Sequence, residues 1–337
     1  MNSTSPTPLL ELAGVSKTFG AARHGRAARA LQALRLTRPP RPARAVDGVS
    51  LAVHRSEVVG LVGESGCGKS TLGRIAADLL APTDGVVRIG GEPRATLTAA
   101  ARKASRLDIQ MVFQDAYASL NPRLRVDRIV GEGALRNGLV QASDYDDYVS
   151  RQLQRAGLDP SARWRYPHQF SGGQRQRINI ARALAVRPRL LICDEAIAAL
   201  DVSIQAQILN LFMDLRASLD LAYLFISHDL GVVRHVSDRV VVMYLGRVVE
   251  SAPTDELFSR PNHPYTRALL DQIPRLDARR TPFRAIEGEI PSPLAPPPGC
   301  HFHPRCPHAM PRCRSEVPRL RGIAVRHESA CHLNDAT

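Results

Sequence analysis

Lysine is almost absent from this chain. It supplies only three of the 45 basic residues, although the formal net charge of the 337-residue chain is +13. A positive balance of that size is compatible with nucleic acid and equally with an anionic membrane surface. A genome-wide preference for arginine accounts for most of these residues, so charge alone does not select a class of partner.

Long apolar runs are missing as well. No run reaches the roughly 18 residues that a membrane-spanning helix needs, and residues 1–6 lack the charged-then-apolar pattern of a secretory signal. We therefore expect a soluble chain that stays in the cytoplasm, where its six cysteines are reduced. The guanine-reading motif Asn-Lys-x-Asp is also absent, which disfavours a GTPase.

At 337 residues the chain exceeds one typical domain, and its apolar content of 44% is enough to bury a core. We expect one large domain and an appendage. Short apolar runs predict strands at 9–19, 57–62, 107–113, 190–193, 221–227 and 239–244. Helical spacing predicts helices at 69–80, 174–186 and 203–219, and recurs between 115 and 169. This alternation favours a parallel sheet covered by helices on both faces.

Two segments depart from the alternation. Residues 21–45 carry seven arginines and three prolines without a dependable period, which predicts a flexible flap. We expect this arginine-rich insertion to lie near anionic headgroups or a membrane protein, with an ordinary disordered insertion as the alternative. Beyond about residue 260 proline becomes frequent, which indicates a different, smaller domain.

A glycine-rich loop stands between a predicted strand and a predicted helix. Its small residues let consecutive backbone N–H groups point at phosphate oxygens, and the following helix adds a positive dipole. A lysine there reaches the β- and γ-phosphates, and the next hydroxyl holds Mg²⁺. A chance match in an ordinary turn is the alternative, which the flanking elements disfavour. We predict nucleotide contacts from Gly63, Glu64, Ser65, Gly66, Cys67, Gly68, Lys69, Ser70 and Thr71.

Two carboxylates end the apolar run at 190–193. We expect Asp194 to bind Mg²⁺ with Ser70, directly or through water, and Glu195 to be the general base for the attacking water. Side chains alternate along a strand, which would separate these neighbours. The backbone turns where a strand ends, so both carboxylates could still face the phosphates. The sequence leaves these two arrangements open.

A Ser-Gly-Gly-Gln segment at 171–174 lies between the phosphate loop and the two carboxylates. This order of three motifs resembles the ATPase subunits of ABC transporters, and the resemblance covers nearly the whole chain. It implies an α/β fold with a P-loop NTPase (ABC ATPase) core over 1–258, a helical subdomain at about 115–175, and a small Pro- and Cys-rich C-terminal domain over 259–337.

The resemblance also implies residue roles. The signature residues Ser171, Gly172, Gly173 and Gln174 would belong to a nucleotide site completed across a dimer, with Ser171 and Gly173 against the γ-phosphate. Gln114 would sense Mg²⁺ and the attacking water and link to the membrane partner, and His228 would contact the γ-phosphate. Taken singly, such a His or Gln is more often structural; their order after consecutive strands favours function. Asp201 would join the two sites, and Phe19 would stack on adenine.

A narrower resemblance is to the ATPases of oligopeptide and dipeptide permeases. The segments that carry it are 118–123, 166–170, 201–207, 263–266 and 288–293. The chain departs from that pattern at Ala116, Gln169 and Ala198. None of these three positions is among the residues expected to act on the phosphates. Ala116 and Gln169 bear on coupling to the permease.

Four cysteines stand in the proline-rich tail, with gaps of five, six and seventeen residues. Because the segment is too small for its own core, the thiols suggest a metal-stabilised fold. Their spacing does not choose the metal. By resemblance to related ATPases that carry a [4Fe-4S] cluster here, we favour that cluster. Zn²⁺, helped by His301, His303 or His308, is the alternative, and free thiols are the third reading. The ligands would be Cys300, Cys306, Cys313 and Cys331.

We predict an ATP-hydrolysing subunit, with ATP and Mg²⁺, that powers import of di- or oligopeptides or related solutes. By resemblance, its partners are a second ATPase subunit, identical or paralogous, two membrane permease subunits and an extracytoplasmic binding protein. It would lie peripherally at the cytoplasmic face of the inner membrane, with no nucleic acid partner. Nickel or glutathione import is the alternative. A soluble ABC ATPase acting on DNA or ribosomes is disfavoured, because such proteins generally carry two cassettes or a long coiled coil.

Overall fold

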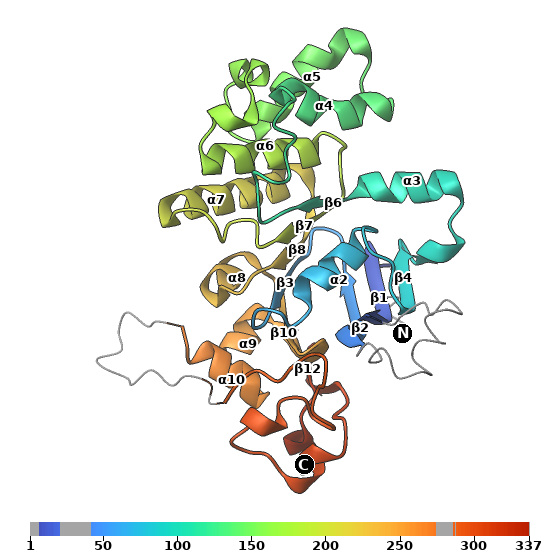
Figure 1. Cartoon of the computed structure of the whole chain (residues 1–337), viewed down its shortest axis with the longest axis vertical. Coiled ribbons are helices and arrows are strands. Elements are labelled where there is room, and N and C mark those ends of the chain that lie inside the picture. The colour runs from blue at the N-terminus through green and yellow to red at the C-terminus, as the bar shows by residue number, and fades with distance from the viewer. Residues whose placement is uncertain (1–6, 21–41, 274–285, 287, 337) are drawn as a thin grey trace, which may run out of the picture.

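The computed structural model describes residues 7–20, 42–273, 286 and 288–336 (Figure 1). Most of the predicted arginine-rich insertion therefore lies outside the described residues. The strands are β1 (Leu10–Phe19), β2 (Ala43–Val53), β3 (Val58–Val62), β4 (Asp84–Ile89), β5 (Glu92–Pro93), β6 (Ile109–Val112), β7 (Leu190–Asp194), β8 (Ala222–Ile226), β9 (Arg239–Tyr244), β10 (Arg247–Pro253), β11 (Arg321–Ala324) and β12 (His327–Ser329).

Helices alternate with the strands, as the sequence predicts. The α-helices are α2 (Lys69–Ala76), α3 (Ala99–Asp108), α4 (Val126–Arg136), α5 (Tyr145–Arg155), α6 (Gly172–Leu184), α7 (Val202–Leu219), α8 (Leu230–Val236), α9 (Thr254–Ser259) and α10 (Pro264–Leu270). Two short 3₁₀ helices matter below, η5 (His303–Arg305) and η6 (Pro311–Arg314).

The larger sheet has the strand order β11-β12-β10-β9-β3-β8-β7-β6. Its members from β9 to β6 pair in parallel, while β10, β12 and β11 add on as antiparallel strands. The central strands β3, β7 and β8 are buried at every position. Because helices cover both faces of such strands, they contain continuous apolar runs rather than alternating ones. The carboxyl ends of the parallel strands share one edge.

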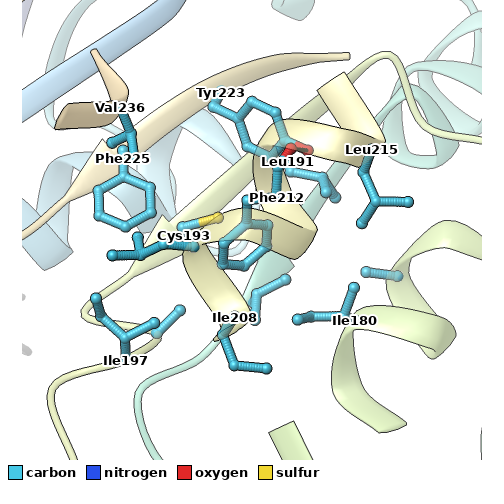
Figure 2. Close-up of a cluster of buried hydrophobic side chains, with 14 of the residues drawn as sticks. Ile180, Leu191, Cys193, Ile197, Ile208, Phe212, Leu215, Tyr223, Phe225 and Val236 are labelled. Atoms are coloured by element: carbon cyan, nitrogen blue, oxygen red, sulfur yellow. Dashed lines mark hydrogen bonds between the residues drawn. The ribbon is translucent and has the colours of Figure 1, made fainter. Parts of the chain in front are cut away.

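One face of this sheet packs on α7 (Figure 2). Phe212 of α7 meets Tyr223 and Phe225 of β8 edge to face, at ring-centroid distances of 5.7 and 6.1 Å. The Tyr223 hydroxyl donates a hydrogen bond to the Phe212 carbonyl oxygen at 3.0 Å, so its burial leaves no unpaired hydroxyl. Ile208 and Leu215 fill the same layer.

A second sheet, in the order β2-β1-β4-β5, is antiparallel. Its apolar side forms a separate core with α2 and the opposite face of the larger sheet; Leu10, Val46 and Leu72 are members. The sequence patterns do not predict β2 or β4. Each has its alternation interrupted by glycine and charge, at Asp47, Gly48 and Gly85 among others.

Helices α4, α5 and α6 pack on one another (Figure 1). The first two lie within the range of about 115–175 predicted for a helical subdomain, and most of α6 lies beyond it. Signals within the sequence set the start of α6. Ser171 is its N-cap, with the Ser171 hydroxyl accepting from the Gln174 amide N–H and the Gln174 side chain accepting from the Ser171 N–H. Most predicted boundaries differ from the observed ones by one or two residues. The helix expected over 69–80 differs more and ends at Ala76. The strand expected over 107–113 begins only at Ile109, because α3 occupies the residues before it.

The C-terminal region joins the main sheet rather than standing apart. Strand β12 pairs with β10, at Glu250 with Ser329 and Ser251 with Glu328, so the tail extends the eight-stranded sheet. Phe302 is buried and packs on the rings of Tyr244 and Tyr265. Hydrogen-bonded strands and shared aromatic packing therefore hold the C-terminal region on the main sheet.

Candidate functional site

The phosphate loop occupies residues 63–68, between β3 and α2, as predicted. Gly63 and Gly68 have φ angles of 151° and 105°, and a Cβ on them would lie 2.2 Å from the Met243 carbonyl oxygen and 2.0 Å from the Ala45 carbonyl oxygen. Only glycine fits such close backbone contacts. The loop is thus held against β9 and β2 before α2 begins at Lys69.

Lys69 is 4% exposed and lies across the loop. Its ammonium group donates hydrogen bonds to the carbonyl oxygens of Gly63 at 2.7 Å and Glu64 at 3.0 Å. Burial raises the pKa of the neighbouring Cys67 thiol, which therefore stays neutral as a small loop residue. A cation fixed beside a row of loop amides is suited to a triphosphate.

Ser70 and Asp194 come together across the sheet edge. The Ser70 hydroxyl donates to Asp194 Oδ1 at 2.8 Å, joining the first turn of α2 to the end of β7. Burial raises the pKa of Asp194, and the hydrogen bond from Ser70 opposes that shift. A hydroxyl and a carboxylate are oxygen donors, the ligand type that Mg²⁺ prefers, so this pair fits the predicted metal site.

The three predicted catalytic residues lie together, and Glu195 contacts the other two. Gln114 Nε2 donates to Glu195 Oε2 at 3.0 Å, and His228 Nδ1 lies 3.5 Å from Glu195 Oε1. These residues follow the strands β6, β7 and β8, which are neighbours in the sheet. Glu195 has a φ of 48°, so the chain turns sharply after Asp194. That turn lets both consecutive carboxylates lie at the same edge of the sheet, with Asp194 against Ser70 and Glu195 against Gln114 and His228.

The signature segment is exposed and lies away from this group. Ser171, Gly172 and Gln174 are exposed, and within the described residues no hydrogen bond or ion pair joins the segment to the phosphate loop. A Cβ on Gly173 would lie 2.5 Å from the Ile204 side chain of α7, so glycine allows α6 to approach α7 closely. Asp201 is also exposed and is the N-cap of α7.

Two polar residues of α6 position the segment around Gln114, and sequence reasoning missed both. Buried Asn179 accepts from the Ser119 hydroxyl at 2.9 Å and donates to the Ala116 carbonyl oxygen at 3.4 Å. Buried Gln176 donates to the Phe113 carbonyl oxygen at 3.4 Å. Their spacing of three residues on an otherwise apolar helix face was the available signal.

Phe19 lies at the end of β1 and is 43% exposed. It pairs with Ala43 of β2, two residues before Ala45, whose carbonyl oxygen contacts the phosphate loop at Gly68. The antiparallel pairing thus brings the end of β1 beside the strand that contacts the phosphate loop. Its stacking on adenine stays a prediction.

The four cysteines of the tail lie near one another. Burial raises the pKa of Cys300 to about 11, with smaller contributions from Cys313, Cys306 and Cys331. Among the described residues, which include all four, no group of three or more His, Cys, Asp or Glu side chains is arranged to hold a metal ion. The structure therefore gives no support to the [4Fe-4S] cluster or to the Zn²⁺ alternative, and both stay predictions.

In the part of the chain that the structure describes, no helix is both long and apolar enough to cross a bilayer.

Two family models match the chain. The model described as "ABC transporter" matches residues 46–198, and the model described as "Oligopeptide/dipeptide transporter, C-terminal region" matches residues 249–313. The first match contains the phosphate loop, the signature segment and both carboxylates. The second contains α10, η5 and three of the four tail cysteines.

Curated relatives are similar over most of their length. The oligopeptide transport ATP-binding protein AppF of Bacillus subtilis is 49% identical over 294 residues, which cover 86% of this chain and 89% of the relative. The di/tripeptide transport ATP-binding protein DppF of Pseudomonas aeruginosa is 50% identical over 290 residues, covering 86% and 90%.

Solved structures share the fold. One is cbiO1 from Clostridium perfringens, part of an ABC transporter complex, with a TM-score of 0.62 and 25% identity over 75% of this chain and 92% of the other. Another is a dimeric ATP-binding cassette in a post-hydrolysis state with ADP and phosphate, with a TM-score of 0.60 and 27% identity over 73% and 98%. The chain belongs to the ATP-binding proteins of ABC transporters, in the oligopeptide/dipeptide transporter family.

Proposed function

We propose that this chain hydrolyses ATP at the sheet edge around Glu195 and thereby drives peptide import through a membrane permease. The observation that carries the proposal is the contact of one carboxylate with both Gln114 and His228. Glu195 then accepts a proton from the attacking water. Gln114 orients that water, and His228 contacts the γ-phosphate.

The other predicted residues hold the nucleotide. The loop amides and Lys69 bind the β- and γ-phosphates, and Phe19 stacks on adenine. Ser70 and Asp194 would hold Mg²⁺, which when bound neutralises charge on the phosphate oxygens. The Ser70–Asp194 hydrogen bond keeps both oxygen donors on the same side of α2.

The signature segment serves a second ATPase subunit. The exposed Ser171 hydroxyl and the amide groups at the N-terminus of α6 suit an anion brought by another chain. Two subunits facing one another would enclose two ATP molecules, each between one phosphate loop and the other subunit's signature segment. The partner is a second copy or a paralogue.

The permease docks near Gln114. A groove of about 700 Å³ lies between α4, α6 and the end of β6, and Phe113, Ile129 and Arg182 contribute to its lining. Phe113 lines the groove and is the neighbour of Gln114 in the chain. If a permease segment bound in the groove moves, it shifts Phe113 and therefore the position of Gln114 against Glu195. The protein would lie at the cytoplasmic face of the inner membrane, and an extracytoplasmic binding protein would deliver peptide.

The test is ATP turnover of the complete transporter reconstituted in liposomes. Binding protein loaded with a di- or oligopeptide should raise turnover severalfold, while unloaded binding protein should not. Stimulation by nickel or glutathione in place of peptide would assign the alternative substrate. An ATP turnover that is unchanged by the permease and the binding protein would contradict the proposal.

A further inference from the structure

A buried ion pair joins the C-terminal region to the phosphate loop. Arg305, the last residue of η5, donates from Nη1 to Glu64 Oε2 at 2.8 Å and from Nη2 to Glu64 Oε1 at 3.0 Å. The Arg305 side chain is 4% exposed and that of Glu64 is 20% exposed. Such a bidentate pair fixes orientation as well as distance. The two residues are 241 positions apart in the chain.

The backbone of the same loop residue is also engaged. The Glu64 N–H donates to the hydroxyl of Tyr265 on α10 at 2.9 Å. Its carbonyl oxygen accepts from Lys69 Nζ at 3.0 Å and from the Cys67 N–H at 3.3 Å. Two of the four partners, Arg305 and Tyr265, belong to the C-terminal region, and the other two belong to the phosphate loop and the lysine that follows it.

The two C-terminal partners share one packed cluster. The Tyr244 and Tyr265 rings lie 4.7 Å apart, and each has its centroid 5.3 Å from that of Phe302. The Arg305 guanidinium lies 5.9 Å from the Tyr244 ring centroid and also donates to the Tyr244 hydroxyl at 3.4 Å. This cluster is part of the main core, so the tail cannot move without disturbing the loop contacts.

We propose that Arg305 is a positioning residue for ATP binding, acting through Glu64 to hold the phosphate loop in its nucleotide-binding shape. The C-terminal region then stabilises the conformation of the phosphate loop. An unpaired Glu64 carboxylate would also add negative charge beside the triphosphate, and Arg305 neutralises it. The proposal assumes only that the loop binds ATP.

ATP binding and the order of the C-terminal region must affect each other equally, because the two equilibria are thermodynamically linked. If an ordered C-terminal region favours ATP binding, bound ATP must favour the ordered region by the same factor. Amide hydrogens of residues 300–314, which include η5 and η6, should therefore exchange more slowly when ATP is bound. A side chain that merely stabilised the tail would not transmit this protection.

The experiment measures the ATP dissociation constant and hydrogen exchange of the full-length chain and its Arg305→Ala variant. We expect ATP affinity to fall about tenfold, within the range usual for two coupled sites. The ATP-dependent protection of residues 300–314 should be lost. In a double-mutant cycle, adding Arg305→Ala to Glu64→Ala should cost little more than Glu64→Ala alone. The matched control is Arg312→Ala, because Arg312 pairs with Glu316 and Asp335 in the same region.

The outcomes separate this inference from the proposed function. A parent chain that binds no ATP would count against the function itself. Parent affinity in Arg305→Ala, or fully additive losses with Glu64→Ala, would overturn the inference. If Arg305→Ala fails to fold, Arg305→Lys provides the same test, because it keeps the charge and loses the bidentate geometry. An intermediate loss of affinity there, with retained circular dichroism, supports the proposal, and unchanged affinity overturns it.

Discussion

Glu195 has a backbone conformation that L-residues seldom adopt, with a φ of 48°. A left-handed residue of this kind costs about 1–2 kcal/mol. The Glu195 N–H is bonded to the Ile226 carbonyl oxygen of β8 at 3.0 Å, which holds the turn in place. Strain kept at the end of a central strand is expected where it aims a functional side chain. Here the turn brings the Glu195 carboxylate to Gln114 and His228.

Glu195→Gln tests this role directly. Glutamine keeps the size and a hydrogen-bonding oxygen but accepts no proton, so turnover should fall about 10²–10⁴-fold. ATP affinity should stay within a few-fold of the parent, and ATP-bound dimers should accumulate because hydrolysis no longer separates them. Turnover is measured by phosphate release and dimers by light scattering.

The control for this change is Glu132→Gln. Glu132 is half exposed on α4 and pairs only with Arg136 among the ion pairs of the described residues. The same loss of charge there should leave the turnover of the isolated subunit unchanged. Near-parental turnover in Glu195→Gln would remove Glu195 from the role of base.

The phosphate loop, as an element, depends on glycine at particular positions. Gly68→Ala keeps a φ of 105° and places a Cβ 2.0 Å from the Ala45 carbonyl oxygen, which is backbone and has little freedom to move. The loop must shift, so we expect ATP affinity to fall at least about tenfold, equivalent to about 1.4 kcal/mol. Isothermal titration calorimetry measures the change.

Gly138→Ala is the control for Gly68→Ala, because it introduces the unfavourable left-handed backbone conformation without the steric clash. Gly138 has a φ of 69°, and a Cβ there would meet nothing within 4 Å. This variant should lose about 1 kcal/mol of stability from the left-handed conformation alone and keep its ATP affinity. Equal losses of affinity in both variants would mean that general instability, not loop shape, controls binding.

Helix α6 has a second task besides carrying the signature segment. Asn179→Ala leaves the Ala116 carbonyl oxygen and the Ser119 hydroxyl without that partner inside the protein, which should cost about 1–3 kcal/mol of unfolding free energy. Urea denaturation measures the loss. Ser218→Ala, at the exposed end of α7, should stay within about 0.5 kcal/mol of the parent; a similar loss there would refute a special role for Asn179.

At the scale of the whole molecule, stability should fall in acid through His263. Burial lowers the pKa of His263, the N-cap of α10, to about 3, below the ordinary histidine value of 6.5 that applies to the unfolded chain. The folded protein therefore keeps His263 neutral while the unfolded chain takes up a proton below pH 6.5. His263 contributes its full stabilisation at pH values above its pKa in the unfolded chain. That contribution is lost progressively as the pH falls toward the lower pKa of His263 in the folded protein.

The size of that effect follows from linkage. Between pH 7.5 and pH 5.5, His263 should remove about 1.4 kcal/mol from the free energy of unfolding. His263→Asn keeps a cap acceptor for the Tyr265 N–H and has no proton to gain in this range. The variant should therefore show a pH dependence smaller by that amount in chemical denaturation. An unchanged slope would show that His263 is not the responsible group.

The motifs were predictable because each depends on local chemistry. Glycines at 63, 66 and 68 are needed by a phosphate loop whatever surrounds it, and Ser171 with Gln174 forms a capping box within four residues. Apolar runs gave the central strands because buried parallel strands require them. The family follows from the order of these motifs, which the comparisons confirm.

Contacts between distant segments were decided by the tertiary structure. Pairing of β1 with β2 brings the end of β1 beside the strand that contacts the phosphate loop at Gly68, and pairing of β12 with β10 attaches the tail. That attachment supplies hydrogen bonds and aromatic packing that composition alone does not reveal. The metal centre of the tail stays a prediction. The sequence determined local conformation and named the candidate catalytic groups. Only the folded chain placed Gln114, Glu195 and His228 on one sheet edge and Arg305 against Glu64, because parallel strands and a returning tail bring together residues that lie far apart in the chain.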